Sequence, residues 1–401
     1  YKADHGCVVV METKTGHIKA IANLGRAEDG SYFETQNYAI NETHEPGSTF
    51  KLLDLIAVLD DKKADTSTVY DSRGGQIQYY GSWVRDSHKG GYGKISLARG
   101  FEVSSNTVLV QSVYNNYKNN PKQFVDRIRS YGLHKPLGLP IKGEGKAVIP
   151  YPGTARWSGT SLPWMAFGYG LSVTPLQTLT MYNAVANNGV MVKPIFVSEV
   201  KEWNKTIKKF NTEIINPKIC SQETLGKVQA VLENVVKRGT GSKLYSKDFS
   251  MSGKTGTAQV NYGKPDMYYA SSFVGYFPAV QPKYSCIVVI HKPDKTVGYY
   301  GADVSGPVFK RIAQKIFTDS PATNHVKNID AKVVSQEKKY ANYYQEVVKE
   351  GQIVPNVKGM EAMDAVALLE NLGLKVKVVG IGRVKNNPLP RDKNLIKIKL
   401  L

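Results

Sequence analysis

The chain has 401 residues, 41% of them hydrophobic and 10% aromatic, so it is long enough for two or three domains and too apolar to be disordered as a whole. Lysine and arginine number 53 against 34 acidic residues, which gives a formal charge of +19. These basic residues are spread along the whole chain, without an arginine-rich arm or a helix-turn-helix pattern. The charge therefore indicates an anionic environment and gives no support for a nucleic-acid partner.

The cysteines and the apolar runs exclude further classes. Cys7, Cys220 and Cys286 are far apart and form no CxxC pair, which argues against a zinc site or a disulfide framework and favours buried free thiols. The longest apolar stretches, such as Cys286–Ile290, are far below the ~20 residues that span a bilayer. No export signal precedes Tyr1, and strand-like sequence starts within a few residues, so we expect the chain to begin inside a longer protein.

The first half of the chain begins with two β-rich runs, Gly6–Glu12 and His17–Asn23, whose connecting turn residues predict a hairpin. Apolar residues at helical spacing predict a helix over Thr49–Leu59, and because it is apolar almost all round, we expect it to be buried. Residues 66–95 are rich in Gly, Ser, Tyr and Asp and predict a long loop. Further helices are predicted near 96–117, 121–131 and Thr174–Ala186.

The second half predicts three strands between two helices. The strands are expected over Met251–Val260, Tyr269–Phe277 and Ser285–His291, and the helices over Ser221–Lys237 and Pro307–Thr318. A strand pair, helices, three strands and a last helix indicate an α+β fold. We expect a mostly antiparallel sheet, flanked by helices, in which the strands from the two ends of this region pair with each other.

A change in composition divides the chain into three parts. Residues 1–320 form one large predicted domain, and the polar, charged residues 321–352 are expected to be a linker or docking arm. Residues 353–401 predict a small α/β unit. Its expected elements are a helix over Met360–Leu372 and strands over Lys375–Val379 and Leu395–Leu400.

Three short motifs carry chemistry: Ser48-Thr49-Phe50-Lys51 (S-x-x-K), Ser104-Ser105-Asn106 (S-x-N) and Lys254-Thr255-Gly256-Thr257 (K-T-G-T). Each is weak alone, since the chain holds a second S-x-x-K at Ser335–Lys338 and a second K-T-G at Lys14–Gly16. The first of these copies lies in the charged linker and the second in the turn of the hairpin. Their surroundings therefore separate them from the three motifs that occur together.

Ser48 follows Pro46-Gly47 at the start of a predicted helix, which places its hydroxyl at the positive end of the helix dipole and Lys51 on the same face. A serine needs a base to attack a carbonyl, and a neutral lysine can serve. Only about one lysine in 2,500 is neutral at pH 7, and lowering its pKa to ~7 requires roughly 4.6 kcal/mol. Burial and a second cation, Lys254, can supply this. Taken alone, Ser48 would be an ordinary helix N-cap.

The other two motifs supply the partners of such a pair. Ser104 can relay a proton and the Asn106 amide can hold a substrate carbonyl, although alone they would be ordinary capping or loop residues. Lys254–Thr257 lies in an alternating strand, which can pair with an extended peptide while its lysine and threonines contact a carboxylate. The backbone N–H groups of Ser48 and Thr257 would then form an oxyanion hole.

With these motifs in this order, residues 4–318 resemble the transpeptidase domain of class B penicillin-binding proteins of the cell-division type, whose fold is shared with serine β-lactamases. Residues 353–401 resemble a PASTA module through Val354-Pro355-Asn356-Val357 and Leu372-Gly373-Leu374. Further matching segments are Asn37-Tyr38-Ala39, Glu45-Pro46-Gly47, Phe167-Gly168-Tyr169-Gly170, Thr174-Pro175-Leu176-Gln177, Gly275-Tyr276-Phe277-Pro278-Ala279 and Gly306-Pro307-Val308-Phe309.

In that family the serine attacks the penultimate D-alanine carbonyl of a peptidoglycan stem peptide and expels the last D-alanine. An amine of a neighbouring stem then takes the acyl group, and β-lactams acylate the same serine. The resemblance implies a serine D,D-transpeptidase of septal cell-wall synthesis that needs no metal and no cofactor. It implies catalytic roles for Ser48, Lys51, Ser104, Asn106 and Lys254, and substrate binding by Thr255, Gly256 and Thr257.

The resemblance also implies a location and partners. Family members carry a membrane anchor and a non-catalytic domain before this one, so we expect an enzyme on the extracytoplasmic (periplasmic) face of the cytoplasmic membrane, anchored by an N-terminal segment absent from this chain. Its partners would be stem peptides, as D-Ala-D-Ala donor and amine acceptor, and β-lactams. Division-machinery proteins would bind through the missing N-terminal part.

Two other functions stay open from the sequence. One is a serine β-lactamase or a β-lactam sensor of the same fold, against which stand the length of residues 1–320, the asparagine of the second motif and the appended unit. The other is a non-enzymatic cell-wall-binding scaffold, against which stands the intact set of three motifs.

Overall fold

The computed structural model describes residues 1–203, 205–319, 355–386 and 395–399. The chain divides into two compact units, Tyr1–Pro321 and Ala322–Leu401. The predicted linker, residues 321–352, lies outside the described residues. None of the helices in the described ranges combines the length and apolar character that crossing a bilayer requires.

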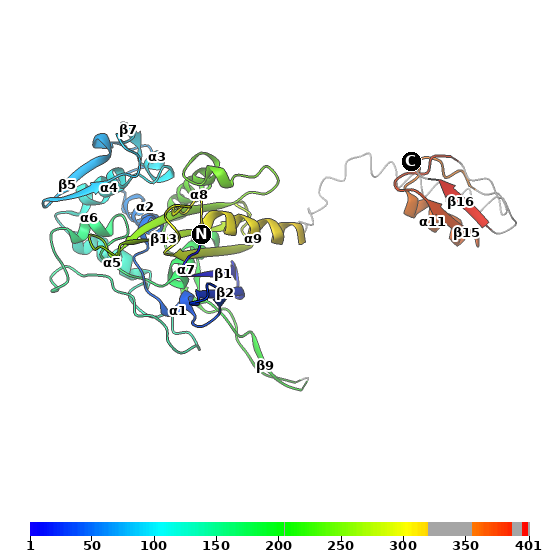
Figure 1. The fold of residues 1–401 in the computed structure, drawn as a ribbon, viewed down its shortest axis with the longest axis horizontal. Coiled ribbons are helices and arrows are strands. Elements are labelled where there is room, and N and C mark those ends of the chain that lie inside the picture. The colour runs from blue at the N-terminus through cyan, green and yellow to red at the C-terminus, as the bar shows by residue number, and fades with distance from the viewer. Residues whose placement is uncertain (204, 320–354, 387–394, 400–401) are drawn as a thin grey trace. The chain divides into compact units, whose positions relative to one another are not determined.

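The first unit is built on a six-stranded antiparallel sheet with the strand order β12-β13-β14-β1-β2-β3 (Figure 1). Strand β1 pairs with β2 on one side and with β14 on the other, so strands from the two ends of this unit lie side by side. The predicted α+β fold and the pairing of the end strands are therefore confirmed. The strands are β1 (His5–Glu12), β2 (Ile18–Arg26), β3 (Tyr32–Phe33), β12 (Ser252–Val260), β13 (Tyr268–Phe277) and β14 (Tyr284–His291).

Alternate residues of these strands face two separate hydrophobic cores, as the period of two in a strand requires. Val9 and Met11 of β1 belong to the larger core, together with the buried residues of helix α7 (Pro175–Ala186). Val10 faces the other way and belongs to a smaller core with Phe309 of helix α9 (Ser305–Asp319). Helices α7 and α9 therefore cover opposite faces of the sheet.

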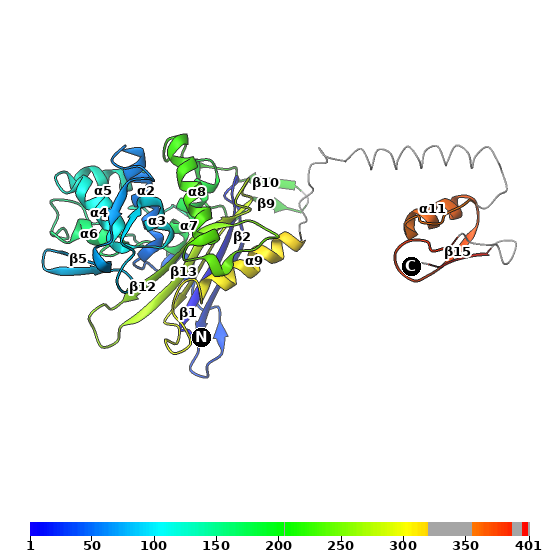
Figure 2. The same cartoon turned by 90° about the horizontal axis from the view of Figure 1, so that it is seen from above.

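The remaining longer helices of this unit are α2 (Lys51–Asp60), α3 (Leu97–Glu102), α4 (Asn106–Tyr117), α5 (Pro121–Ser130), α6 (Ser161–Met165) and α8 (Gln222–Arg238). Helices α2 to α6 gather to one side of the sheet in both ribbon views (Figures 1 and 2). Residues Lys51 to Leu59 of α2 are all buried, as its all-round apolar sequence predicts. The charged Lys51 is thereby held in an apolar setting.

Two local predictions are wrong. Residues 66–95, expected as a loop, hold two strand pairs, whose strands are too short and too polar to show a period: β4 (Val69–Asp71) with β7 (Lys94–Ser96), and β5 (Gln76–Tyr79) with β6 (Ser82–Arg85). The single helix expected over 96–117 is two helices, α3 and α4, which break at Ser104. Ser104 has a φ of 59°, a left-handed conformation that no α-helix continues.

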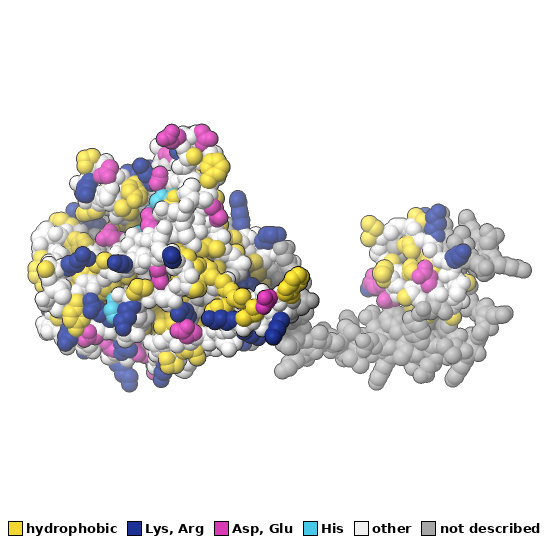
Figure 3. All heavy atoms as spheres, turned by 90° about the horizontal axis from the view of Figure 1, so that it is seen from below, with side chains coloured by type: hydrophobic (Ala, Val, Ile, Leu, Met, Phe, Trp, Pro, Cys, Tyr) yellow, Lys and Arg dark blue, Asp and Glu magenta, His cyan; other side chains and the backbone are white. Residues whose placement is uncertain are grey.

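The shorter elements complete the first unit. They are α1 (Tyr38–Asn41), β8 (Met191–Val192), β9 (Glu199–Glu202), β10 (Lys205–Lys209), β11 (Ile214–Asn216) and the 3-10 turns Gly47–Thr49, Arg73–Gly75 and Ser242–Leu244. The hairpin of β9 and β10, which was not predicted, projects from the body of the unit (Figure 1). On the face drawn in Figure 3, lysine and arginine side chains are scattered among acidic and uncharged ones.

The second unit contains helix α11 (Ala362–Asn371) and the parallel strand pair of β15 (Lys375–Val379) and β16 (Leu395–Lys399). These elements lie within two residues of the predicted ones. Val357, Leu368, Leu369 and Ile398 are among the residues of a small core of their own. Part of the segment that carries the resemblance to a PASTA module, including Val354, lies outside the described residues.

Candidate active site

Ser48 lies in the 3-10 turn Gly47–Thr49, directly before α2, whose first residue is Lys51. The turn is held between two elements. A side chain on Gly168 would place its Cβ 2.0 Å from the Gly47 carbonyl oxygen, and one on Gly47 would lie 3.2 Å from Cβ of Ala258 in β12. Gly47 and Thr49 are buried while Ser48 is partly exposed, so this packing presents only the serine to solvent.

Lys51 is fully buried and reaches across to the S-x-N motif. Its Nζ donates to the Asn106 Oδ1 at 2.6 Å, to the Ser104 carbonyl at 2.8 Å and to the Ser104 Oγ at 3.3 Å. Burial lowers the pKa of Lys51 to about 7, although the charges of Asp86 and Asp54 act in the opposite direction. A substantial share of neutral amine is therefore present at neutral pH, as a general base requires.

Lys254 comes from β12 and contacts Ser104, the serine that Lys51 also contacts. Its Nζ donates to Ser104 Oγ at 2.8 Å and to the Thr255 carbonyl at 3.1 Å, and it lies 5.6 Å from the centre of the Phe101 ring. Burial, and secondly the charge of Lys51, lower the pKa of Lys254 well below its usual range. Because both amines contact one hydroxyl, the two positive charges disfavour each other.

The S-x-N motif is placed by an acceptor that the sequence did not indicate. Asp86, which directly follows β6, accepts from the backbone N–H of Asn106 at 2.6 Å and of Thr107 at 2.9 Å. It also accepts from the hydroxyls of Ser105 at 2.9 Å and Thr107 at 3.0 Å. A carboxylate at the N-terminus of α4 is favourable to the helix dipole, and four bonds define the position of the motif.

Asn106 uses both ends of its amide within the protein. Its Oδ1 accepts from Lys51, and its Nδ2 donates to the Arg85 carbonyl at 2.7 Å. The predicted role of Asn106 in holding a substrate carbonyl would therefore require the Nδ2 group to exchange the Arg85 carbonyl for the substrate.

Strand β12 is the edge strand of the sheet, so one side of it is free to pair with an extended peptide. The N–H of Gln259 points to that side, because it donates to the Tyr169 hydroxyl at 2.8 Å. Backbone groups alternate along a strand, so the N–H of Thr257, two residues earlier, points to the same side. That is the orientation that an oxyanion hole formed with Ser48 requires.

The other residues of the third motif are more enclosed. The hydroxyl of Thr255 shares a 2.7 Å hydrogen bond with that of Thr240, and the hydroxyl of Thr257 accepts from the Gly301 N–H at 3.0 Å. Gly256 has no room for a side chain, since its Cβ would lie 2.2 Å from the Ser272 Oγ. Thr255 is buried, whereas Thr257 is partly exposed.

A cavity of about 580 Å³ adjoins these residues. Asn106 and Thr257 line it, together with Glu45 and a mostly aromatic wall that includes Tyr169 and Tyr300. Burial raises the pKa of Glu45, whose Oε1 accepts from the Gly170 N–H at 2.8 Å. The cavity is large enough for a peptide end or a bicyclic ligand, and its aromatic wall suits apolar groups.

The structure thus brings together one residue of each motif, Lys51, Ser104 and Lys254, of which the first and last are 203 positions apart in the chain. It also adds the partly buried Asp86 and the fully buried Asp54, whose two carboxylate oxygens have no hydrogen-bond partner among the described residues. The second copies of two motifs lie elsewhere. Lys14–Gly16 is in the turn between β1 and β2, and Ser335–Lys338 lies outside the described residues.

Comparison with known proteins gives consistent results. Residues 6–314 match the family described as penicillin binding protein transpeptidase domain. The chain is 29% identical to stage V sporulation protein D of Bacillus subtilis over 97% of this chain and 59% of that protein. It is 28% identical to peptidoglycan D,D-transpeptidase FtsI of Escherichia coli K12 over 78% of this chain and 51% of that protein. The chain spans about half the length of the curated relatives it matches.

Solved structures show the same fold. Penicillin binding protein 3 of Mycobacterium tuberculosis, complexed with aztreonam, is 28% identical and superposes with a TM-score of 0.69, which covers 80% of this chain and 74% of that one. The transpeptidase domain of penicillin-binding protein 3 from Burkholderia pseudomallei has a TM-score of 0.66 at 24% identity and covers 80% of this chain and 89% of that one.

Proposed function

The chain belongs to the penicillin-binding-protein transpeptidase domain family, and from this membership and the geometry of the site we propose that it is a serine D,D-transpeptidase that cross-links peptidoglycan stem peptides during septal wall synthesis. The curated relatives support the substrate class, since one of them is named a peptidoglycan D,D-transpeptidase. β-Lactams would inhibit it by acylating the same serine.

Acylation starts at Ser48. Neutral Lys51 takes the proton of the Ser48 hydroxyl as its oxygen attacks the carbonyl of the penultimate D-alanine. The negative charge that develops on the carbonyl oxygen is stabilised by the N–H groups of Ser48 and Thr257. The lowered pKa of Lys51 supports this assignment, because an exposed lysine would be almost wholly protonated at neutral pH.

The proton must then reach the leaving group. Ser104 lies between the two lysines, accepting from Lys254 at 2.8 Å and from Lys51 at 3.3 Å. It can therefore pass a proton to the amine of the departing D-alanine as the C–N bond breaks, and regain one from Lys51. The acyl group stays on Ser48 until an amine of a second stem attacks it and releases the serine.

Substrate binding falls to the free edge of β12 and the cavity beside it. The donor peptide would pair with the backbone of Thr257 and Gln259 and place its terminal carboxylate near the Thr257 hydroxyl, with the enclosed Thr255 and Gly256 shaping the strand behind it. Lys254 is fully buried, so in its protonated form it would act on the carboxylate at short range without direct exposure to solvent. The formal charge of +19 suits anionic cell-wall polymer.

The location and the second unit belong to the same proposal. An extracytoplasmic enzyme anchored in the cytoplasmic membrane, with division proteins as partners, fits the relatives named for sporulation and for peptidoglycan synthesis. The α/β elements of 355–399 support a PASTA-like module joined by a linker over 321–352. No metal or cofactor takes part in this mechanism.

The observation that carries the proposal is the convergence of two buried lysines, Lys51 and Lys254, on the Ser104 hydroxyl, with Lys51 three residues after the partly exposed Ser48. The test is turnover of a chromogenic β-lactam, followed by release of D-alanine from a stem pentapeptide. We expect one slow acylation per chain, and D-alanine release that depends on an acceptor amine. Rapid multiple turnover of the β-lactam would instead indicate a β-lactamase, and absence of both reactions would indicate a scaffold.

A further inference from the structure

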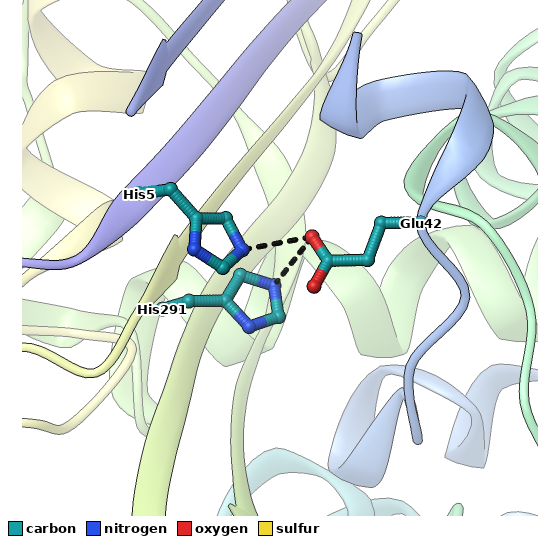
Figure 4. Close-up of side chains that lie close together, drawn as sticks. All are labelled: His5, Glu42 and His291. Atoms are coloured by element: carbon teal, nitrogen blue, oxygen red, sulfur yellow. Dashed lines mark hydrogen bonds and ion pairs between the residues drawn. The ribbon is translucent and has the colours of Figure 1, made fainter. Parts of the chain in front are cut away.

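Three potential metal ligands meet where the first and last strands of the sheet pair. His5, the first residue of β1, lies directly opposite His291, the last residue of β14. Glu42 follows α1 and points one carboxylate oxygen toward a nitrogen of each ring (Figure 4). Its Oε2 lies 2.8 Å from His5 Nε2 and 3.8 Å from His291 Nε2. One ligand atom from each residue lies within 4.8 Å of the other two.

The second ring nitrogen of His5, Nδ1, also faces a carboxylate. This contact determines whether Nε2 presents a proton or a lone pair to Glu42. Nδ1 of His5 lies 3.0 Å from Oδ2 of Asp4, and in the tautomer that carries its proton on Nδ1 the ring donates to this carboxylate. A neutral His5 then has a lone pair at Nε2, directed at a carboxylate that also has only lone pairs to offer. Either a second proton or a cation must lie between them. A carboxylate behind the distal nitrogen is also the arrangement that orients metal-bound histidines.

His291 supplies the second nitrogen. Its side chain is only 3% exposed, and its ring stacks on that of His5 with 4.3 Å between the ring centres. Its Nδ1 has no hydrogen-bond partner among the described residues. An imidazole nitrogen held in place by burial and ring stacking is a suitable ligand for a metal ion.

We propose that His5, Glu42 and His291 bind one divalent transition-metal ion of the zinc class. Two imidazole nitrogens and one carboxylate oxygen are typical ligands for zinc, whereas magnesium and calcium prefer sites made of oxygen. Water would complete a tetrahedral shell. Two ligand atoms of such an ion lie about 3.3 Å apart, so Glu42 must withdraw slightly and the stacked rings must tilt on binding.

The site would act on structure and not on the acyl-transfer chemistry. Glu42 is six residues before Ser48, and the intervening His44 pairs its backbone with Val173 through hydrogen bonds of 3.1 Å in both directions. A metal ion would therefore link strands β1 and β14 to the segment that delivers the nucleophile. This inference does not depend on the proposed transpeptidase activity.

The test is zinc binding by the tag-free chain after removal of metal with EDTA. We expect one Zn²⁺ per chain, bound more tightly than Mg²⁺ or Ca²⁺, and a melting temperature that rises with zinc. Replacing a ligand, as in His5→Gln or Glu42→Gln, is expected to weaken binding by about 100-fold or more, and Asp4→Asn by about tenfold. Cobalt in place of zinc should show the visible absorption of a tetrahedral site.

His17→Gln is the matched control, because His17 also faces a carboxylate, that of Glu12 at 3.7 Å, but is not part of a three-ligand cluster among the described residues. It should bind zinc like the unaltered chain. Equal zinc affinity in the unaltered chain, His5→Gln and Glu42→Gln, or no zinc-dependent rise in melting temperature, would overturn the proposal. The cluster would then be a hydrogen-bonded histidine–carboxylate network only.

Discussion

Lys254 donates a hydrogen bond of 2.8 Å to Ser104, although 150 residues separate the two in the chain. The bond joins the edge strand of the sheet to the break between helices α3 and α4. Because Lys51 contacts the same hydroxyl at 3.3 Å, two amines that are each costly to bury share one proton carrier. Because the amines of Lys51 and Lys254 are buried close together, the fold favours loss of a proton from one of them.

The first prediction concerns the pH dependence of acylation. Lys51 must be neutral to accept the Ser48 proton, and its pKa is lowered to about 7. The rate of acylation by a labelled penicillin should therefore fall about tenfold per pH unit below pH 7 and level off above it. Stopped-flow rates between pH 5.5 and 8.5 measure this, and a flat profile below pH 7 would exclude Lys51 as the base.

Removal of the Lys51 amine gives the matching variant test. Lys51→Ala should lower the acylation rate by roughly 10²-fold to 10⁴-fold, the usual contribution of a general base. The melting temperature should change little, because the lost hydrogen bonds are offset by removal of a buried amine. Lys264→Ala, at an exposed position, serves as the control for both measurements. Unfolding of Lys51→Ala together with loss of acylation would indicate a structural role for this lysine.

The second prediction concerns Asp86. Asp86→Ala removes four hydrogen bonds to residues 105–107, so Ser104 and Asn106 lose their position relative to Lys51. We expect the free energy of unfolding to fall by about 2 to 3 kcal/mol. Acylation should slow by at least tenfold in protein that remains folded. Asp71→Ala, which removes an exposed acceptor from the Arg73 N–H, is the control. Normal acylation of Asp86→Ala would show that Ser104 and Asn106 keep their positions without Asp86.

The third prediction concerns Gly168, which packs on the 3-10 turn that carries Ser48. In Gly168→Ala the new Cβ would lie 2.0 Å from the Gly47 carbonyl oxygen, so the turn that carries Ser48 must move. Gly132→Ala shares the positive φ but meets nothing within 4 Å, so it isolates the backbone cost of about 1 to 2 kcal/mol. Gly168→Ala should be more destabilising than this and should lose acylation. Equal stability and activity of the two variants would contradict the packing described for Ser48.

The fourth prediction concerns Asp54, which is fully buried. Burial raises its pKa well above the ordinary range, although the charge of Lys51 acts the other way. The folded state therefore keeps a proton that the unfolded state loses above pH ~4, so this group makes stability fall as pH rises. Relative to the native chain, Asp54→Asn should gain stability as the pH rises above the unfolded pKa of ~4, by up to about 1.4 kcal/mol per pH unit.

Asp60, in the same helix, offers a control of opposite sign. Burial alone would raise its pKa, but hydrogen bonds from Ser221 and the charge of Arg127 outweigh it, and the net pKa is lowered. Its contribution to stability is present above the unfolded pKa and is lost as the pH falls. Chemical denaturation at several pH values distinguishes Asp54→Asn from Asp60→Asn, and parallel pH profiles for Asp54→Asn and the native chain would refute a protonated Asp54.

Much of this architecture could be predicted because its signals are local. Helix α7 begins at Pro175 and has Thr174 as its N-cap, in a capping box with Gln177. The core strands alternate clearly, so the bounds of these elements fall within a few residues of those predicted. The three motifs could be recognised from their order. Asp86 could not, because it lies in a polar segment whose short strands lack a period.

Other features depend on three-dimensional convergence, which spacing in the sequence does not show. The left-handed Ser104 breaks a helical pattern that the sequence continues, and this break turns its hydroxyl toward two lysines. Likewise, 37 residues separate His5 from Glu42 and a further 249 separate Glu42 from His291, so no ligand-spacing motif indicates their cluster. The pairing of β1 with β14 brings the two histidines together, and Glu42 reaches them from the end of α1.

The central claim, that Ser48 is the acylated nucleophile, is tested most directly by labelling the chain with a fluorescent penicillin and mapping the modified peptide by mass spectrometry. We predict one label per chain, attached to Ser48, and no label in Ser48→Ala. A Ser48→Ala chain that still takes the label, or a label attached to any other residue, would contradict the assignment of the active site.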